Sequence, residues 1–235
     1  MIRLGDKILA WGVHIFTASG LLAAFMAIIA IDQLDWRACF LWLFACFIID
    51  SVDGTLARKF RVKEVLPYMD GKNIDYIIDF STYAVIPAFF FYKAEMVDPQ
   101  FMYLSLAIML LSAALYYGKV GMVEDDQYFV GFPVLWNFVV FFQFFICQNQ
   151  PTLNFVSVIF FGVLHFVPLK FAYPSMTKKY FWPHLLFSVL GLAGAAIVLY
   201  NYPVRTLPFQ VAAIIGGVYF SIFAIFDTLR LSKEN

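Results

Sequence analysis

Two pairs of aspartates stand beside apolar segments of this sequence. Asp50 and Asp53 are three residues apart in FIIDSVDGTLAR. Asp75 and Asp79 are four residues apart in DGKNIDYIIDFSTY. Residues at these spacings share one face of a helix, so each pair can present two carboxylates to the same side. Ionisable groups in apolar segments are costly and usually serve a function. The four aspartates are therefore the candidate site.

The chemistry of such a site follows from its charge. Four carboxylates that converge in a partly dry place repel one another, so they must take up protons or bind cations. Oxygen ligands alone suit Mg²⁺ or Mn²⁺, and two ions among four carboxylates is a reasonable number. The alternative role of helix cap fits Asp75, near a helix start, but not Asp79, one turn deeper.

Small residues surround the acids, namely Gly54, Ala57 and Gly71. Such residues allow helices, or a ligand, to approach the backbone closely. Arg58 follows Ala57 directly, and its guanidinium could hold a phosphate oxygen.

Composition places the elements that carry these residues in a membrane. The 235 residues are 63% hydrophobic and 14% charged, whereas soluble domains are about half apolar and about a quarter charged. A net charge of zero gives no sign of a nucleic-acid partner. Cys39, Cys46 and Cys147 lie in apolar stretches without metal-binding spacing.

The expected fold is all-α, a polytopic bundle of about eight transmembrane helices in a single domain, residues 1–235. A spanning helix needs about 20 mostly apolar residues. The runs that qualify are 13–31, 36–55, 74–94, 99–118, 129–148, 152–169, 182–201 and 208–228. Residues 1–10 are amphipathic, and they form either a helix on the inner membrane surface or a cytoplasmic tail.

The positions of Lys and Arg predict the orientation. With the N-terminus in the cytoplasm, all 16 of these residues except Arg37, Lys93 and Arg205 fall on the inside. Both termini are then cytoplasmic. Both aspartate pairs lie at the same depth, at the cytoplasmic ends of the second and third spans.

From Asp50 to Asp79 the residues read D-x2-D-G-x2-A-R-x12-G-x3-D-x3-D. This pattern closely resembles the signature of the CDP-alcohol phosphotransferases, which are membrane enzymes. The resemblance implies metal binding by Asp50, Asp53 and Asp75. It also implies that Asp79 is both a metal ligand and the general base. It further implies that Gly54, Ala57, Arg58 and Gly71 pack around the nucleotide and phosphates, and it suggests a homodimer.

The spacing inside the motif resembles that of one subgroup of the family. Most members of the family have about eight residues between Arg and Gly, whereas twelve lie between Arg58 and Gly71 here. The longer spacing, the chain length and the stretch Glu124–Asn137 are similar to the bacterial phosphatidylcholine synthases. This similarity implies CDP-diacylglycerol and choline as substrates, phosphatidylcholine and CMP as products, and a location in the inner membrane.

Choline is a quaternary ammonium, so aromatic faces and a carboxylate are its expected partners. The candidates are Tyr83, Tyr117, Asp126 and Trp136. A belt of interfacial aromatic residues beside a solvated acidic loop is the alternative explanation.

Other polar residues are interpreted as structural. His14, His165 and His184 are expected to be packed or interfacial imidazoles, and Asp227 an interfacial acid. Pro87 is expected to kink the third span.

Two other functions stay open at this point. The same chemistry could use serine, inositol phosphate or glycerol phosphate as acceptor, in which case basic residues should lie near the site. A divalent-cation transporter would also contain intramembrane acids, but it should place them near the midplane rather than at one face.

Overall fold

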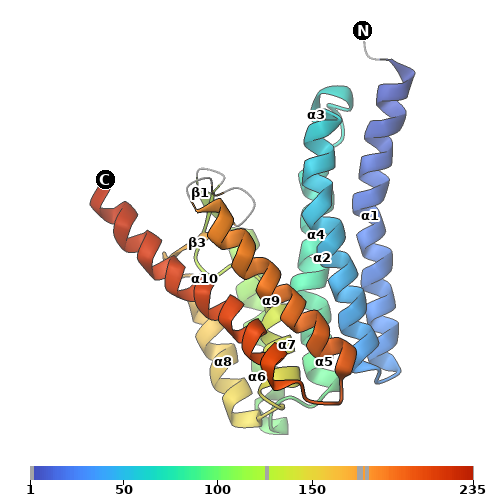
Figure 1. The fold of residues 1–235 in the computed structure, drawn as a ribbon. Helices are drawn as coiled ribbons and strands as arrows, with labels where there is room; N and C mark the ends of the chain where they lie inside the picture. Colours follow the sequence, from blue (N-terminus) through green and yellow to red (C-terminus); the bar gives the residue numbers. More distant parts are fainter. Residues whose placement is uncertain (1–2, 125–126, 174–176, 178–179, 235) are drawn as a thin grey trace. The chain divides into compact units, whose positions relative to one another are not determined.

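The computed structural model describes residues 3–124, 127–173, 177 and 180–234. Most of these residues are helical (Figure 1). By its internal contacts the chain divides into two compact units, Met1–Ala94 and Glu95–Asn235. Six helices of the described part are long and apolar enough to cross a membrane. The protein is therefore a multi-pass membrane protein.

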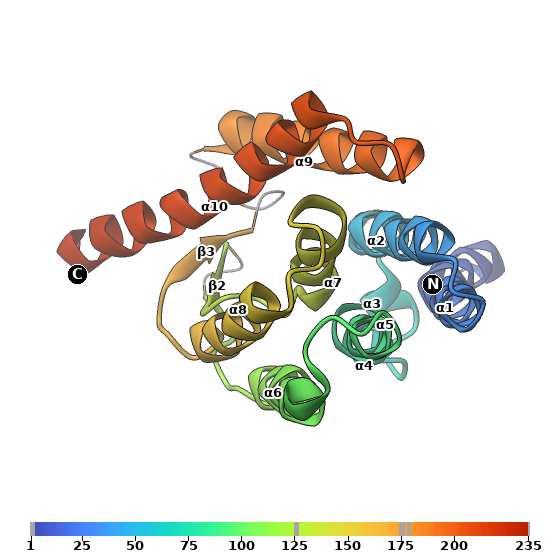
Figure 2. The same cartoon turned by 90° about the horizontal axis from the view of Figure 1, so that it is seen from below.

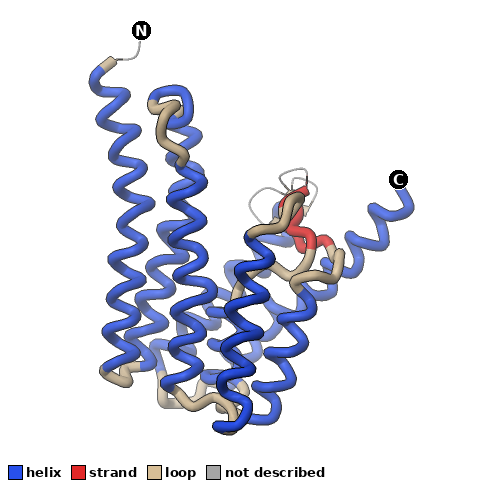
Figure 3. Tube along the Cα trace, turned by 180° about the vertical axis from the view of Figure 1, so that it is seen from behind, coloured by secondary structure: helices blue, strands red, loops and turns tan. Residues whose placement is uncertain are grey.

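The first unit is helical throughout. Its elements are α1 (Leu4–Asp32), α2 (Trp36–Lys59), α3 (Val62–Val65), α4 (Gly71–Phe80), the π-helical turn η1 (Ser81–Val85) and α5 (Ile86–Lys93). Helix α1 packs along α2 and also against α4 and α5, and Figure 3 shows these helices side by side. The run from α4 through η1 to α5 forms one spanning segment, Gly71–Lys93.

Small side chains on α1 allow this close packing. The buried face of α1 includes five alanines, Ala10, Ala23, Ala24, Ala27 and Ala30. A Cβ atom added at Gly20 would lie 3.2 Å from Cγ2 of Ile78 on α4. The two helices therefore approach closely at this depth, which is how small residues promote packing between membrane helices.

A π-helical turn, Ser81–Val85, interrupts the third long helix just before Pro87, the residue that is predicted to kink it. Proline has no N–H to donate to the preceding turn, which weakens the helical ladder there. The backbone N–H of Ile86 bonds instead to the carbonyl of Ser81, five residues earlier. A π-helical turn shifts the side chains that follow it around the helix axis.

The second unit contains helices and a small sheet. Its elements are α6 (Pro99–Tyr117), β1 (Val123–Glu124), β2 (Tyr128–Val130), α7 (Trp136–Phe141), the π-helical turn η2 (Phe142–Ile146), α8 (Pro151–Leu164), β3 (Lys170–Ala172), α9 (Phe181–Asn201) and α10 (Leu207–Glu234). Helix α6 packs against α8. Helices α9 and α10 form a hairpin, visible from below in Figure 2. This hairpin is tight because Gly191 and Gly216 face each other.

The expectation of eight spans is not confirmed. The run 129–148 contains a helix only over Trp136–Ile146, and the run 152–169 corresponds to the 14-residue α8. The first run is interrupted because its beginning forms part of an antiparallel sheet with the order β1-β2-β3. Strand β2 pairs Tyr128 with Ala172 of β3. Apolar runs of this length do not distinguish strands from helices, so the sheet was not predicted.

Gly131 ends strand β2 in a conformation that only glycine adopts easily. Its φ is +94°, and an added Cβ would collide with the carbonyl oxygen of His165. We expect Gly131→Ala to lower the free energy of unfolding by about 3 kcal/mol, because strain and overlap add. Thermal unfolding in detergent measures this loss.

Gly121 supplies the matched control for that substitution. Its φ is +76°, but an added Cβ would meet no atom within 4 Å. Gly121→Ala should therefore cost only about 1 kcal/mol of backbone strain. Equal losses in the two variants would contradict the role assigned to the His165 carbonyl.

Candidate metal centre

The four predicted aspartates all lie in the first unit, on two neighbouring segments. Asp50 and Asp53 occupy the last turns of α2, which ends at Lys59. Asp75 and Asp79 occupy successive turns of α4, which begins at Gly71. Asp70 caps α4, because its Oδ1 accepts a hydrogen bond from the N–H of Lys72 at 3.0 Å. The cap fixes where the helix starts and hence which face its acids occupy.

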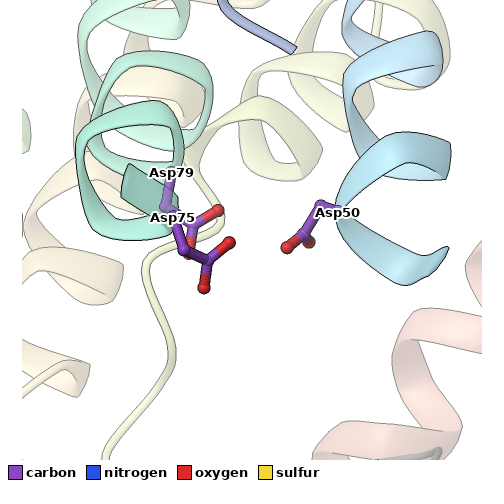
Figure 4. Close-up of side chains that lie close together, drawn as sticks. All are labelled: Asp50, Asp75 and Asp79. Atoms are coloured by element: carbon purple, nitrogen blue, oxygen red, sulfur yellow. The ribbon is translucent and has the colours of Figure 1, made fainter. Parts of the chain in front are cut away.

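Three of the four carboxylates converge. Asp50, Asp75 and Asp79 each place one carboxylate oxygen within 4.8 Å of the other two. Figure 4 shows the two acids of α4 reaching toward Asp50 on α2. All three side chains are partly buried. Within the described part of the chain, no ion pair neutralises them.

These residues fit a divalent cation. Three like charges at this separation repel strongly unless a cation or protons balance them. The donor atoms are carboxylate oxygens only, which is the set that Mg²⁺ and Mn²⁺ prefer. The cluster can therefore hold a hard metal ion.

Asp53 lies beside this cluster rather than in it. Its side chain is 8% exposed and interacts with Thr17 of α1. It is close enough to Asp75 and Asp79 for its charge to act on both. Thr17 was not singled out from the sequence, although it lies three residues from His14 on the buried face of α1.

Tyr83 contacts the cluster directly. Its hydroxyl donates a hydrogen bond to Oδ2 of Asp50 at 2.7 Å, and its side chain is 6% exposed. Tyr83 lies in the π-helical turn η1, whose irregular geometry sets the direction of this side chain. From the sequence, Tyr83 is predicted only as a choline contact, because a contact with α2 has no signal in the sequence.

The four residues matched to nucleotide binding also lie in the first unit. Arg58 folds back along α2, where its Nη2 donates to Oγ1 of Thr55 at 3.1 Å. Its Nη1 would lie 3.5 Å from a Cβ added at Gly54. Ala57 packs against a small apolar cluster that includes Val62. Gly71 opens α4, where an added Cβ would lie 3.3 Å from Cε1 of His14.

The remaining choline candidates belong to the second unit. Trp136 begins α7 and is 1% exposed. Its ring meets that of His165 edge to face, with centroids 5.4 Å apart. Tyr117 ends α6 and is partly buried. Asp126 lies outside the described residues.

Six candidate spans and a cluster of three carboxylates define a multi-pass membrane protein with a site able to bind a metal ion. The chain is 34% identical over 229 residues to the phosphatidylcholine synthase of Pseudomonas aeruginosa, covering 97% of this chain and 93% of that protein. It is 38% identical over 215 residues to the phosphatidylcholine synthase of Mesorhizobium japonicum, covering 88% of this chain and 79% of that protein. The chain belongs to the phosphatidylcholine synthase family.

A third relative agrees with this assignment. The phosphatidylcholine synthase of Borreliella burgdorferi is 39% identical over 174 residues, which cover 74% of each chain. No family model matches the chain. The wider resemblance to the CDP-alcohol phosphotransferases therefore stays a prediction.

Proposed function

We propose that this protein condenses CDP-diacylglycerol with choline to give phosphatidylcholine and CMP. The observation that carries the proposal is the cluster of Asp50, Asp75 and Asp79 in a chain that resembles named phosphatidylcholine synthases over nearly its whole length. The sequence motif that runs from Asp50 to Asp79 also supports it.

The proposed reaction is a substitution at phosphorus. The choline hydroxyl oxygen forms a bond to the phosphorus that carries diacylglycerol. The bond from that phosphorus to the bridging oxygen of the pyrophosphate breaks, and CMP leaves with the electron pair. Asp79 takes the hydroxyl proton as general base. Reactions of this type depend on positioning and charge neutralisation more than on covalent help from the protein.

We propose that the carboxylates hold divalent ions, Mn²⁺ or Mg²⁺, with two as the expected number. Asp50, Asp75 and Asp79 supply the converging oxygens, and Asp53 is the fourth proposed ligand. When bound, such ions neutralise the phosphate charge and stabilise both the attacking and the leaving oxygen.

The binding of the two substrates is also a proposal. Gly54, Ala57, Arg58 and Gly71 are assigned to the nucleotide and phosphates by the family pattern. Tyr83, Tyr117, Asp126 and Trp136 are the candidates for choline, because aromatic faces and carboxylates suit a quaternary ammonium.

The proposal extends to the organisation of the protein. Residues 1–235 act as a single CDP-alcohol phosphotransferase domain. The protein lies in the bacterial inner membrane with both termini in the cytoplasm, since nearly all Lys and Arg then fall on the inner side. It works as a homodimer.

Tyr83→Phe tests the metal site. Removing the hydroxyl deletes the 2.7 Å hydrogen bond to Asp50 and leaves the ring in place. Groups that orient a metal ligand typically contribute 10- to 100-fold to metal affinity. We therefore expect the Mn²⁺ concentration for half-maximal activity to rise by about tenfold or more. Titration of the purified variant with Mn²⁺ measures it.

Tyr103→Phe is the control, because Tyr103 is 76% exposed. It should leave the metal requirement unchanged. If Tyr83→Phe changed only the KM for choline, with the same Mn²⁺ dependence as the native protein, the hydroxyl would be a choline contact instead.

One assay distinguishes the candidate functions. Purified protein is incubated with CDP-diacylglycerol, Mn²⁺ and labelled choline, serine, inositol phosphate or glycerol phosphate, and lipid product and CMP are measured. Label incorporated from choline alone is the expected result. Incorporation of another alcohol would overturn choline as the acceptor. Mn²⁺ uptake by proteoliposomes without CMP release would indicate the transporter instead.

A further inference from the structure

His14 is a buried imidazole with an unpartnered ring nitrogen. It lies on the inner face of α1 and is 5% exposed. Its Nε2 has no hydrogen-bond partner among the described residues. Buried polar atoms nearly always have a partner, and leaving one without a partner costs roughly 1–3 kcal/mol. The nitrogen is therefore expected to meet a group that the chain does not supply.

In each of the other two histidines, one ring nitrogen lies within hydrogen-bond distance of a partner. Nδ1 of His165 lies 2.6 Å from the carbonyl oxygen of Phe132. Nδ1 of His184 lies 3.0 Å from the hydroxyl of Tyr219. Nε2 of each of these two rings also lacks a hydrogen-bond partner among the described residues, but both rings sit among several aromatic side chains. Among the described residues, His14 has one aromatic neighbour, Trp11. Each of those rings is therefore held by one hydrogen bond and by aromatic packing, whereas His14 has no side-chain hydrogen bond within the described part of the chain.

The surroundings of His14 place it at one end of the acidic site. Its ring edge faces the start of α4, where a Cβ at Gly71 would lie 3.3 Å from its Cε1. Asp75 and Asp79 follow Gly71 by one and two turns of the same segment. Thr17, one turn after His14 on α1, interacts with Asp53. The imidazole therefore lies beside the first turn of α4, one turn before Asp75.

We propose that His14 binds the nucleotide half of CDP-diacylglycerol through Nε2, an inference that rests on the proposed function. When the phosphates of CDP-diacylglycerol bind at the carboxylate cluster, its cytidine and its acyl chains must extend from the cluster in opposite directions. The acyl chains require the apolar part of the helices. The polar cytidine then extends toward the start of α4, which follows a segment with four charged residues, Arg61, Lys63, Glu64 and Asp70. His14 stands at that end.

The chemistry of the ring suits this ligand. A neutral imidazole nitrogen donates or accepts according to its tautomer, and cytidine presents hydroxyl and carbonyl oxygens as well as an amino group. Gly71 contributes by having no side chain, because any Cβ there would press on the ring. His14 would then set affinity for the nucleotide and have no part in choline binding.

Nuclear magnetic resonance of the native protein tests the proposal directly. The chain contains three histidines, so ¹⁵N-histidine labelling in detergent micelles yields three imidazoles. His14→Gln identifies the resonances of His14. With Mn²⁺ replaced by diamagnetic Mg²⁺, added CMP should shift those resonances, and added choline should not. CMP binding without any change at His14 would overturn the proposal, whichever alcohol the enzyme uses.

Binding measurements on variants provide a second test. His14→Leu should raise both the dissociation constant of CMP and the KM for CDP-diacylglycerol about tenfold, the size of one lost hydrogen bond. The KM for the alcohol acceptor should stay unchanged. His14→Gln keeps an N–H donor and should recover part of the affinity. In the control Gly12→Leu, the added side chain starts in open space, so no change is expected. Unaltered CMP affinity in His14→Leu would exclude the contact.

Discussion

Asp79→Asn is expected to abolish turnover without unfolding the protein. The amide has nearly the same shape as the carboxylate, but it carries no negative charge and is a very weak base. One of the three converging oxygens would lose its charge, and the proposed proton acceptor would be lost as well. A general base alone contributes 10²- to 10⁴-fold, so we expect the rate to fall by at least about 1000-fold.

The same substitution should not lower stability in the absence of metal. Asp79 stands close to Asp50 and Asp75, and removing one of several like charges relieves their repulsion. Without Mn²⁺ or Mg²⁺, the variant should unfold at the same temperature as the native protein or higher. Residues of a functional site often lower the stability of the folded protein in this way.

Phosphatidylcholine formation and thermal unfolding, measured on the same purified samples, test both statements. Asp32→Asn is the control, because Asp32 is 76% exposed and pairs with Lys93 at the distant end of α1 at 3.5 Å. It should keep near-native activity. Near-native activity of Asp79→Asn would remove Asp79 from the reaction.

Much of the acidic site follows from the sequence alone. The spacing from Asp75 to Asp79 places both acids on one helix face, and the antiparallel arrangement of α2 and α4 brings Asp50 to them. Asp53 lies beside the three converging carboxylates, and its role as a metal ligand stays a prediction. A spacing of three residues turns a side chain about 60° from its neighbour on an ideal helix. Asp53 therefore points past the cluster toward Thr17 of α1.

The contact of Tyr83 with Asp50 illustrates what local patterns cannot supply. Tyr83 follows Asp79 by four residues, a spacing that would place both on one face of a regular helix, but η1 widens the helix there. Pro87 predicts a distorted helix, but several backbone geometries can accommodate a residue that has no N–H. Which side chain then meets α2 depends on how the two helices pack.

The second unit departs further from the sequence prediction. Residues 129–148 are mostly apolar, and hydropathy treats them as one span. The backbone instead forms β2, a turn at Gly131 and the short helix α7. The pairing of β2 with β3 joins residues some forty positions apart. Pairing between segments so far apart in the sequence produces no periodic hydrophobic pattern in either segment.

Asp227 is the largest correction among the single residues. The sequence places it near the end of the last apolar run, where an interfacial acid is the simplest interpretation. The structure buries its side chain completely and pairs it with Arg230, with Oδ1 and Nη2 2.9 Å apart. Arg230 also donates hydrogen bonds to the hydroxyls of Tyr180 and Tyr128. The pair therefore joins α10 to β2 and to the start of α9.

Asp227→Leu should destabilise the second unit strongly. It would leave the guanidinium of Arg230, whose side chain is only 17% exposed, without a carboxylate. Breaking a buried ion pair by removing one partner costs on the order of 3–5 kcal/mol, because the remaining charge stays desolvated. We expect the unfolding temperature in detergent to fall markedly, and hydrogen exchange in β2 to accelerate because Arg230 holds Tyr128.

The double variant Asp227→Leu/Arg230→Met separates charge from packing. Replacing both members of a buried pair with apolar side chains is often neutral or stabilising. Most of the lost stability should therefore return, although the bonds to Tyr128 and Tyr180 are gone. Asp32→Leu, which breaks the exposed pair with Lys93, should cost less than about 1 kcal/mol. If the double variant were as unstable as Asp227→Leu alone, Arg230 would stabilise the unit through its tyrosine partners rather than through the ion pair.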